Sequence, residues 1–283
     1  MEARIDLHNH TTASDGSESP AEAVRLAKSL GLVAIAVTDH DSVSGVREAM
    51  EAGAALGVEV VPGIEVSADY RGNRAHILGL FIDPDSAALA PVLGWARGER
   101  DRRNERIVAA LAADGFDISL GALTAEYPDA VLGRPHMAEH LMRKGYVSSV
   151  KEAFDRYLGE GRPYYRDRER ISLVQAAACI RGAGGLAMVA HPFQYGYDEA
   201  ELLAYIDTAL AAGCAGVEAY YSEHSPAERD YLLALAAGRG IPVTGGSDWH
   251  GSRKPHIRMG SGIDGSLSVP YEVLVRLKRE LGR

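Results

Sequence analysis

Histidines and acids recur in this 283-residue sequence where short apolar runs end. His8 and His10 follow the first run, and Asp248 and His250 follow the last one. Residues i and i+2 of a strand point to the same side, so each pair can bind one ion from a single strand end. Imidazole and carboxylate donors together suit Mn, Zn or Fe better than Mg or Ca. The spacing therefore predicts a metal site.

The intervening apolar runs carry further donors of the same kind. His40, Glu65 and His191 each follow such a run, and His76 lies in one. A single histidine after a strand is usually structural, but the joint placement of these residues indicates metal binding. Because they are too many for one ion, we expect a multinuclear site with a bridging carboxylate. Ligand imidazoles need acceptors for their other nitrogen, and we consider four acids in the same loops for that role, with turn or capping roles as the alternative: Asp6, Asp39, Asp41 and Glu218.

The remaining histidines are weaker candidates. His136 and His140 have i, i+4 spacing in a helical stretch, which could bind metal, but we expect them to be capping or solvated residues. His224 lies past the sixth expected strand and is a candidate for the pocket, whereas we expect His256 on the surface.

Short apolar runs alternate with helical patterns over most of the chain. We expect strands at 4–7, 33–37, 58–61, 75–81, 186–190, 216–219 and 241–244, and helices at 20–30, 46–56, 199–212, 227–237 and 269–281. The first helix has a capping box, with Ser19 at its start and Glu22 three residues later. Alternating strands and helices favour an α/β fold with a parallel sheet, here a closed barrel, whose chemistry sits at the carboxyl ends of the strands.

The middle of the chain breaks this rhythm. Residues 97–170 show helical patterns without a buried strand, and contain 14 of the 30 Lys and Arg but 13 of the 39 Asp and Glu. This segment has a net charge of +1 and the rest −10. We therefore expect a barrel of residues 1–96 and 171–283, with 97–170 inserted as a small helical cap for the substrate.

The composition excludes several classes of protein. The net charge of −9 argues against binding to duplex DNA, since such binding depends on cations that contact phosphates. No apolar run approaches a membrane span of about 20 residues, and the first residues do not resemble a signal peptide. Cys179 and Cys214 are the only cysteines and lie in apolar contexts. We expect a cytoplasmic protein with buried thiols.

The ordered motifs resemble those of the PHP (polymerase and histidinol phosphatase) family, among the amidohydrolase-like metal hydrolases. The resemblance covers the barrel. It implies a distorted (β/α)7 barrel with three divalent metal ions, Mn²⁺ first and Zn²⁺ or Fe²⁺ as alternatives. The family's ligands correspond to His8, His10, Asp15, His40, Glu65, His76, His191, Asp248 and His250. Asp15 is suggested by the resemblance alone, because Ser14-Asp15-Gly16 otherwise resembles a turn.

The inserted segment resembles that of one branch of the family. Gly133-Arg134-Pro135-His136 and Arg100-x-x-Arg103-Asn104 are similar to stand-alone PHP proteins with a helical insert. That branch includes nucleoside 3′,5′-bisphosphate phosphatases and 5′→3′ exoribonucleases acting on short RNA. The resemblance therefore implies a phosphoric monoester hydrolase that removes the 3′-phosphate from a small nucleotide bisphosphate, such as adenosine 3′,5′-bisphosphate.

Water held between two divalent cations loses its proton near neutral pH, and the bridging hydroxide is the expected nucleophile. Asp248, His224 or a metal-bound water would supply the leaving group's proton. A second phosphate on the substrate needs cations outside the metal centre. Arg134 is the first choice, because Gly133 and Pro135 fix its backbone. Arg134 is also one of the candidate catalytic residues. The full set of candidate substrate-binding residues is Arg100, Arg103, Asn104, Arg134, Arg156 and Arg162, with a solvated helix face as the alternative for each arginine.

Four other functions are alternatives to this one. The first is an exoribonuclease on short RNA, and the second is a phosphatase of the histidinol-phosphate type. A metal-binding module without turnover is disfavoured by the intact ligand set. C–N hydrolysis is disfavoured because no lysine lies in a strand-end motif.

Overall fold

The computed structural model describes residues 3–128 and 131–282. The chain divides into two compact units. The barrel unit comprises Met1–Leu93 and Arg170–Arg283, and the insert unit comprises Gly94–Glu169. In the described part of the chain, no helix has the length and apolar character that crossing a membrane requires.

Seven strands form a distorted (β/α)7 barrel, which confirms the expected fold class. They are β1 (Arg4–Asp6), β2 (Leu32–Val37), β3 (Glu59–Tyr70), β4 (Asn73–Leu80), β6 (Leu186–Val189), β7 (Gly216–Tyr221) and β8 (Val243–Gly246), in the spatial order β8-β7-β6-β4-β3-β2-β1. The barrel closes just past the end of β1, where the Leu7 N–H donates to the carbonyl oxygen of Gly245 at 3.0 Å. Two short strands extend the sheet: β5 (Ile171–Ser172) pairs with β3, and β9 (Val269–Pro270) with β1.

The distortion comes from a hairpin between β3 and β4. The strands are antiparallel and are joined by Arg71 and Gly72, both with positive φ, 53° and 82°. Two successive residues with positive φ are typical of the tight turn that matches the twist of a hairpin. The expectation that Glu65 follows a strand ending at residue 61 is wrong, because β3 continues to Tyr70. Polar residues at 65, 67 and 69 interrupt the apolar run within one continuous strand.

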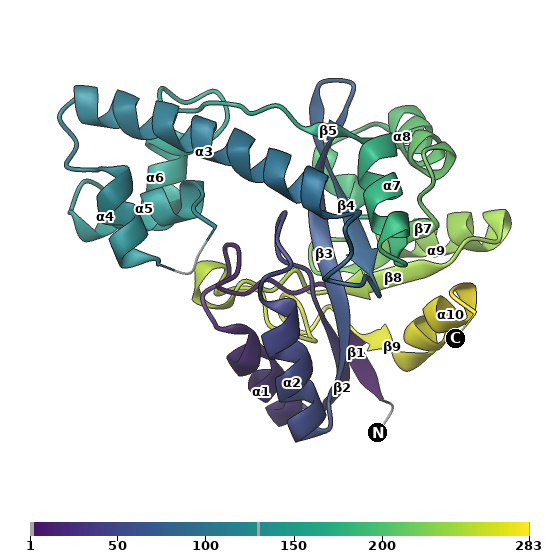
Figure 1. Cartoon of the computed structure of the whole chain (residues 1–283). Helices are drawn as coiled ribbons and strands as arrows, with labels where there is room; N and C mark the ends of the chain where they lie inside the picture. The colour runs from purple at the N-terminus through teal and green to yellow at the C-terminus, as the bar shows by residue number, and fades with distance from the viewer. Residues whose placement is uncertain (1–2, 129–130, 283) are drawn as a thin grey trace. The chain divides into compact units, whose positions relative to one another are not determined.

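Helices cover the sheet. The main ones are α1 (Pro20–Ser29), α2 (Val46–Leu56), α7 (Leu173–Gly182), α8 (Glu199–Ala211), α9 (Pro226–Arg239) and α10 (Tyr271–Glu280). Five of these six lie where the sequence predicts them, whereas α7 is not among the predicted helices. The capping box of Ser19 and Glu22 is present at the start of α1, and α1 and α2 lie side by side against β2 and β3 (Figure 1). The last helix begins two residues later than expected, because Val269 and Pro270 form β9.

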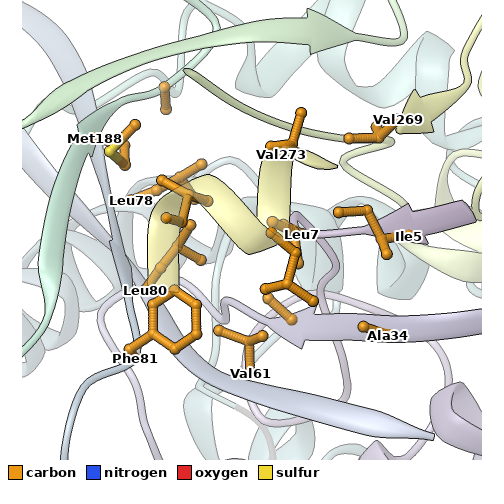
Figure 2. Close-up of a cluster of buried hydrophobic side chains, with 14 of the residues drawn as sticks. Ile5, Leu7, Ala34, Val61, Leu78, Leu80, Phe81, Met188, Val269 and Val273 are labelled. Carbon is orange, nitrogen blue, oxygen red and sulfur yellow. The ribbon is translucent and has the colours of Figure 1, made fainter. Parts of the chain in front are cut away.

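One large apolar cluster supports the end of the barrel's first strand. Ile5 and Leu7 are fully buried, together with Leu78 of β4 and Met188 of β6 (Figure 2). Leu274 of α10 is a fully buried member of the same cluster. Burying such side chains stabilises the fold by about 1.5–3 kcal/mol each. This packing fixes the backbone next to His8 and His10.

The insert unit has its own apolar core. Its elements are most of α3 (Ala90–Ala113), then α4 (Leu120–Glu126), α5 (Arg134–Arg143), α6 (Val150–Ala153) and a π-helical turn (Phe154–Leu158). Ile107, Leu111, Leu123 and Leu141 are fully buried in it. Residues 94–128 and 131–169 contain helices and no strand.

Candidate metal centre

Nine side chains converge at the carboxyl ends of the barrel strands and along the β3–β4 hairpin. Their nitrogen and oxygen atoms form four groups, each with its ligand atoms within 4.8 Å of one another. The groups are His10, Asp15, His40 and His250; His8, Glu65 and His191; His8, His10 and Asp248; and His40, Glu65 and His76. The groups share His8, His10, His40 and Glu65, so they form one continuous cluster.

Backbone hydrogen bonds hold the ends of β1 and β8 together. The Asp248 N–H donates to the His8 carbonyl at 2.9 Å, and the His10 N–H donates to the Trp249 carbonyl at 2.9 Å. Asp6 accepts from the Ser247 N–H at 2.9 Å and from its hydroxyl at 2.6 Å. These contacts bring the two i, i+2 pairs to the same place.

A tight loop after β1 places Asp15. The loop is held by Asp39, which accepts hydrogen bonds from the Thr11 N–H at 2.8 Å and the Ser14 hydroxyl at 2.6 Å. One Asp15 oxygen lies 3.4 Å from His250 Nε2. Asp15 therefore lies in a turn, as the local sequence suggests, and its carboxylate also belongs to the cluster, as the resemblance implies.

Glu65 lies at the centre of the cluster and uses both carboxylate oxygens. Oε1 lies 2.8 Å from His76 Nδ1 and 2.9 Å from His191 Nε2. Oε2 lies 2.9 Å from His40 Nδ1 and 3.3 Å from His10 Nε2. A carboxylate that faces imidazoles on both sides has the arrangement needed to bridge two ions.

Glu218 holds two of the histidines from behind. Its Oε1 accepts from His8 Nδ1 at 2.9 Å, and its Oε2 accepts from the His191 backbone N–H at 2.8 Å. Of the four acids considered as imidazole acceptors, Glu218 has this role. The other three accept from backbone and hydroxyl groups, as with Asp41 and Ser67.

The backbone is strained at two of the cluster's positions. His191 has φ 27° and Asp248 has φ 57°, values that non-glycine residues rarely adopt. Such conformations cost about 1–3 kcal/mol each and concentrate at functional sites, where the surrounding contacts enforce them.

The donor set fits divalent metal ions. Among the described residues, His8 Nε2, both ring nitrogens of His10, His40 Nδ1 and Glu65 Oε2 are buried without a hydrogen-bond partner. Leaving a buried polar atom unpaired costs about 1–3 kcal/mol, so five together require an explanation. Coordination of cations satisfies all five with the donors that Mn, Zn and Fe prefer.

The close packing of acids and imidazoles shifts the pKa values of the cluster in both directions. Burial opposes the charge of Glu65 and Asp15, but the surrounding imidazoles outweigh it and hold the pKa of both carboxyls well below their usual range. Burial lowers the pKa of His76 to about 3, and burial with the nearby Lys254 ammonium lowers that of His250 to about 4. Burial opposes the charge of His8 and His10, but the neighbouring carboxylates outweigh it and raise the pKa of His8 well above its usual range and that of His10 to about 9. Because an imidazole must be neutral to coordinate a metal ion, these two rings would release protons when metal binds.

Lys254 and Tyr221 are neighbours of the cluster that the sequence did not indicate. Lys254 Nζ lies 2.7 Å from Asp248 Oδ2, and the Tyr221 hydroxyl donates to the same oxygen at 2.9 Å. Lys254 lies outside the strand-end motifs, in which the sequence has no lysine, and it contacts the cluster as an ion pair with Asp248. A short 3₁₀ turn (Gly251–Arg253) after His250 returns the chain to Asp248.

The other histidines have local roles or lie beside the cluster. His136 caps α5 by accepting the Gly133 N–H at 3.0 Å, and His140 contacts Glu126 Oε2 at 3.0 Å; both are buried rather than solvated. His224 packs against Tyr221 with ring centroids 5.1 Å apart, and its Nδ1 donates to the Ala219 carbonyl at 3.1 Å. His256 is exposed, as expected.

The insert unit brings together some of its candidate substrate residues. Arg100, Arg103 and Asn104 are buried on α3, and a Cβ placed on Gly133 would lie 3.4 Å from Arg100 Nη1. Arg134, at the start of α5, donates to the Leu158 carbonyl at 3.1 Å. Two candidates have other positions: Arg156 pairs with Glu152 at 2.6 Å, and Arg162 is exposed.

The fold and donor set agree with comparisons to known proteins. The PHP domain family matches residues 6–218, and the chain belongs to this family. It is 35% identical over 252 residues to a 3′,5′-nucleoside bisphosphate phosphatase of Chromobacterium violaceum, covering 88% of this chain and 87% of that protein. It is 32% identical to a 5′-3′ exoribonuclease of Haemophilus influenzae, covering 88% and 91%. A crystal structure from Bifidobacterium adolescentis described as a metal-dependent phosphoesterase superposes with a TM-score of 0.87, at 30% identity over 99% of each chain.

Proposed function

We propose that this protein is a metal-dependent phosphoesterase that removes the 3′-phosphate from nucleoside 3′,5′-bisphosphates. The observation that supports this most strongly is the cluster of nine donors with five buried, unpartnered ligand atoms. The Chromobacterium violaceum relative is named a 3′,5′-nucleoside bisphosphate phosphatase. The proposed ligands of three divalent ions, with Mn²⁺ as the first choice, are the nine residues of the cluster.

The residues of the cluster have separable roles in the proposed reaction. Divalent cations bound here would lower the pKa of a coordinated water from about 15.7 toward about 7 and would offset charge on the phosphate. Glu65 joins neighbouring ligand groups, and Glu218 fixes the ring of His8 so that its Nε2 lone pair faces them. Asp248 presents Oδ1 to the imidazoles, with His10 Nε2 at 3.1 Å.

His224 is the first candidate for proton transfer. Its Nδ1 hydrogen is donated to the Ala219 carbonyl, so Nε2 carries a lone pair that can accept the proton lost by the attacking water and pass it to the leaving oxygen. Burial lowers the pKa of His224, which keeps the ring neutral at pH 7. Asp248 is a weaker candidate, because its Oδ2 already accepts from Tyr221 and Lys254.

The insert is assigned to the phosphate that is retained. Arg100, Arg103 and Arg134 surround the start of α5, and guanidinium groups suit phosphate because they bind it through two parallel hydrogen bonds. Exposed Arg156 and Arg162 are weaker candidates for this role.

A phosphate-release screen tests the proposal. Chelator-stripped enzyme reloaded with Mn²⁺ is incubated with adenosine 3′,5′-bisphosphate, AMP, histidinol phosphate and a short 5′-phosphorylated RNA. We expect rapid release from the bisphosphate, little from AMP and none without metal. Undiminished activity in verified metal-free protein would refute the metal mechanism, and preference for histidinol phosphate would assign the other phosphatase branch.

The second candidate is 5′→3′ exoribonuclease activity on short RNA. It is favoured by the Haemophilus influenzae relative and by the net charge of +1 for residues 97–170 against −10 elsewhere. The same screen decides: release of nucleoside monophosphates from the RNA faster than phosphate from the bisphosphate would replace the leading proposal.

A further inference from the structure

Asp248 divides its two carboxylate oxygens between different partners. Oδ1 faces the imidazoles, with His10 Nε2 at 3.1 Å and His8 Nε2 at 3.5 Å. Oδ2 accepts from Tyr221 at 2.9 Å and from Lys254 at 2.7 Å. Lys254 therefore contacts a proposed metal ligand, and neither the ligand set nor the proposed mechanism gives this contact a role.

Lys254 is the more exposed member of this pair. Its side chain is 35% exposed, whereas the Asp248 side chain is 7% exposed. An ammonium has three N–H donors, and Asp248 accepts from one of them. Lys254 can therefore keep its hydrogen bond to Asp248 while it donates to a second acceptor, such as a phosphate oxygen.

A fixed cation beside the cluster would add to the charge of the bound metal ions. Asp15, Glu65 and Asp248 contribute three carboxylates, which offset part of the positive charge that the ions would present to an incoming phosphate. Of the barrel unit's lysines, Lys28 lies on α1 and Lys278 pairs with Glu59 at 2.7 Å. Lys254 is the lysine of that unit that contacts a carboxylate of the cluster.

We propose that Lys254 is a specificity-determining residue that binds a non-bridging oxygen of the reacting phosphate and favours a phosphomonoester over a phosphodiester. A terminal phosphomonoester carries close to two negative charges at pH 7, whereas a diester carries one. A fixed cation near the phosphate therefore stabilises the monoester more. This inference rests on the proposed function and deepens it, because it names the feature that separates a phosphatase from a nuclease at the same metal centre.

The test compares three variants on two substrates. Lys254→Met removes the charge, Lys254→Arg keeps it, and Tyr221→Phe removes the uncharged donor to the same Asp248 oxygen. The substrates are adenosine 3′,5′-bisphosphate and 5′-phosphorylated diadenylate, with Mn²⁺ content measured for every protein.

We expect Lys254→Met to lower kcat/KM for the bisphosphate by roughly 10- to 150-fold, the range for a hydrogen bond to a charged group, and for the dinucleotide by under about threefold. Lys254→Arg should restore the preference at least in part. Tyr221→Phe should affect both substrates equally, because it acts through Asp248 alone. Equal losses for both substrates in Lys254→Met, or loss of bound Mn²⁺, would make Lys254 a positioning residue for Asp248 and overturn the inference.

Calorimetric titration of the Mn²⁺-loaded proteins with inorganic phosphate gives a second readout that needs no turnover. We expect the Kd of Lys254→Met to rise by about tenfold or more, and an unchanged Kd would overturn the inference. Failure of the wild-type protein to release phosphate from the bisphosphate would instead refute the proposed function, and the titration would still decide the role of Lys254.

Discussion

His8 Nδ1 donates to Glu218 Oε1 at 2.9 Å, and both side chains are completely buried. Because a carboxylate only accepts, this contact places the hydrogen on Nδ1 and leaves the Nε2 lone pair to face the cluster. The other Glu218 oxygen accepts the His191 backbone N–H at 2.8 Å. One acid thus orients a ring from one strand end and the strained backbone of another.

The first prediction follows from this contact. Glu218→Gln should lower metal affinity by about 10- to 100-fold, the usual effect of losing an acceptor behind a ligand histidine. Titration of chelator-stripped protein with Mn²⁺ measures it. Glu272→Gln, on an exposed residue of α10, is the matched control and should have no effect. Unchanged Mn²⁺ affinity in Glu218→Gln would show that His8 keeps its orientation without this acid.

A second prediction concerns the close approach of β8 to His8. A Cβ on Gly246 would lie 2.2 Å from the His8 backbone nitrogen and 2.5 Å from its Cβ, so Gly246→Ala must separate β8 from β1. Overpacking of this kind costs about 1–3 kcal/mol, and metal content should fall with it. Gly238 of α9 has no atom within 4 Å of such a Cβ, so Gly238→Ala should stabilise by up to about 1 kcal/mol. Urea unfolding of both variants checks the pair; equal free energies of unfolding would contradict the argument.

The third prediction addresses the proposed ligands themselves. His8→Ala, Glu65→Ala and Asp248→Ala should each lower kcat by at least about a thousandfold, because each removes part of a preorganised charge-stabilising centre. Steady-state kinetics with metal analysis measures the effect, and His256→Ala serves as the exposed control. Near-wild-type kcat with full metal content in any of the three would remove that residue from the ligand set.

The fourth prediction concerns Arg134 and the retained phosphate. Arg134→Ala should lower kcat/KM for a 3′,5′-bisphosphate by roughly 10- to 150-fold, since a hydrogen bond to a charged group contributes about 1.5–3 kcal/mol. For a nucleoside 3′-monophosphate the loss should stay under about threefold. Arg134 also bonds the Leu158 carbonyl and stacks over Tyr165, so thermal unfolding is measured in parallel. Equal losses for both substrates would assign Arg134 to the reacting phosphate, and no loss would leave it a structural residue.

Local periodicity was enough to predict the barrel, five of its six main helices and most of the cluster, but not α7. His8 with His10, and Asp248 with His250, are recognisable because side chains i and i+2 of an extended chain share a side over any short stretch. The capping box of Ser19 and Glu22 is equally local, because its hydrogen bonds span three residues. Such features depend only on residues that are close together in the chain, so they can be read directly from the sequence.

Only the tertiary structure decided the contacts between distant segments. Glu65 lies inside a strand because the Arg71–Gly72 turn folds β4 back on β3, a pairing that the alternation of strands and helices does not predict. Glu218 reaches His8 across 210 residues, and Lys254 reaches Asp248 only through the turn between them. These contacts depend on barrel closure and on loop paths, which are set by the packing of the whole chain and not by the spacing of residues within any one segment.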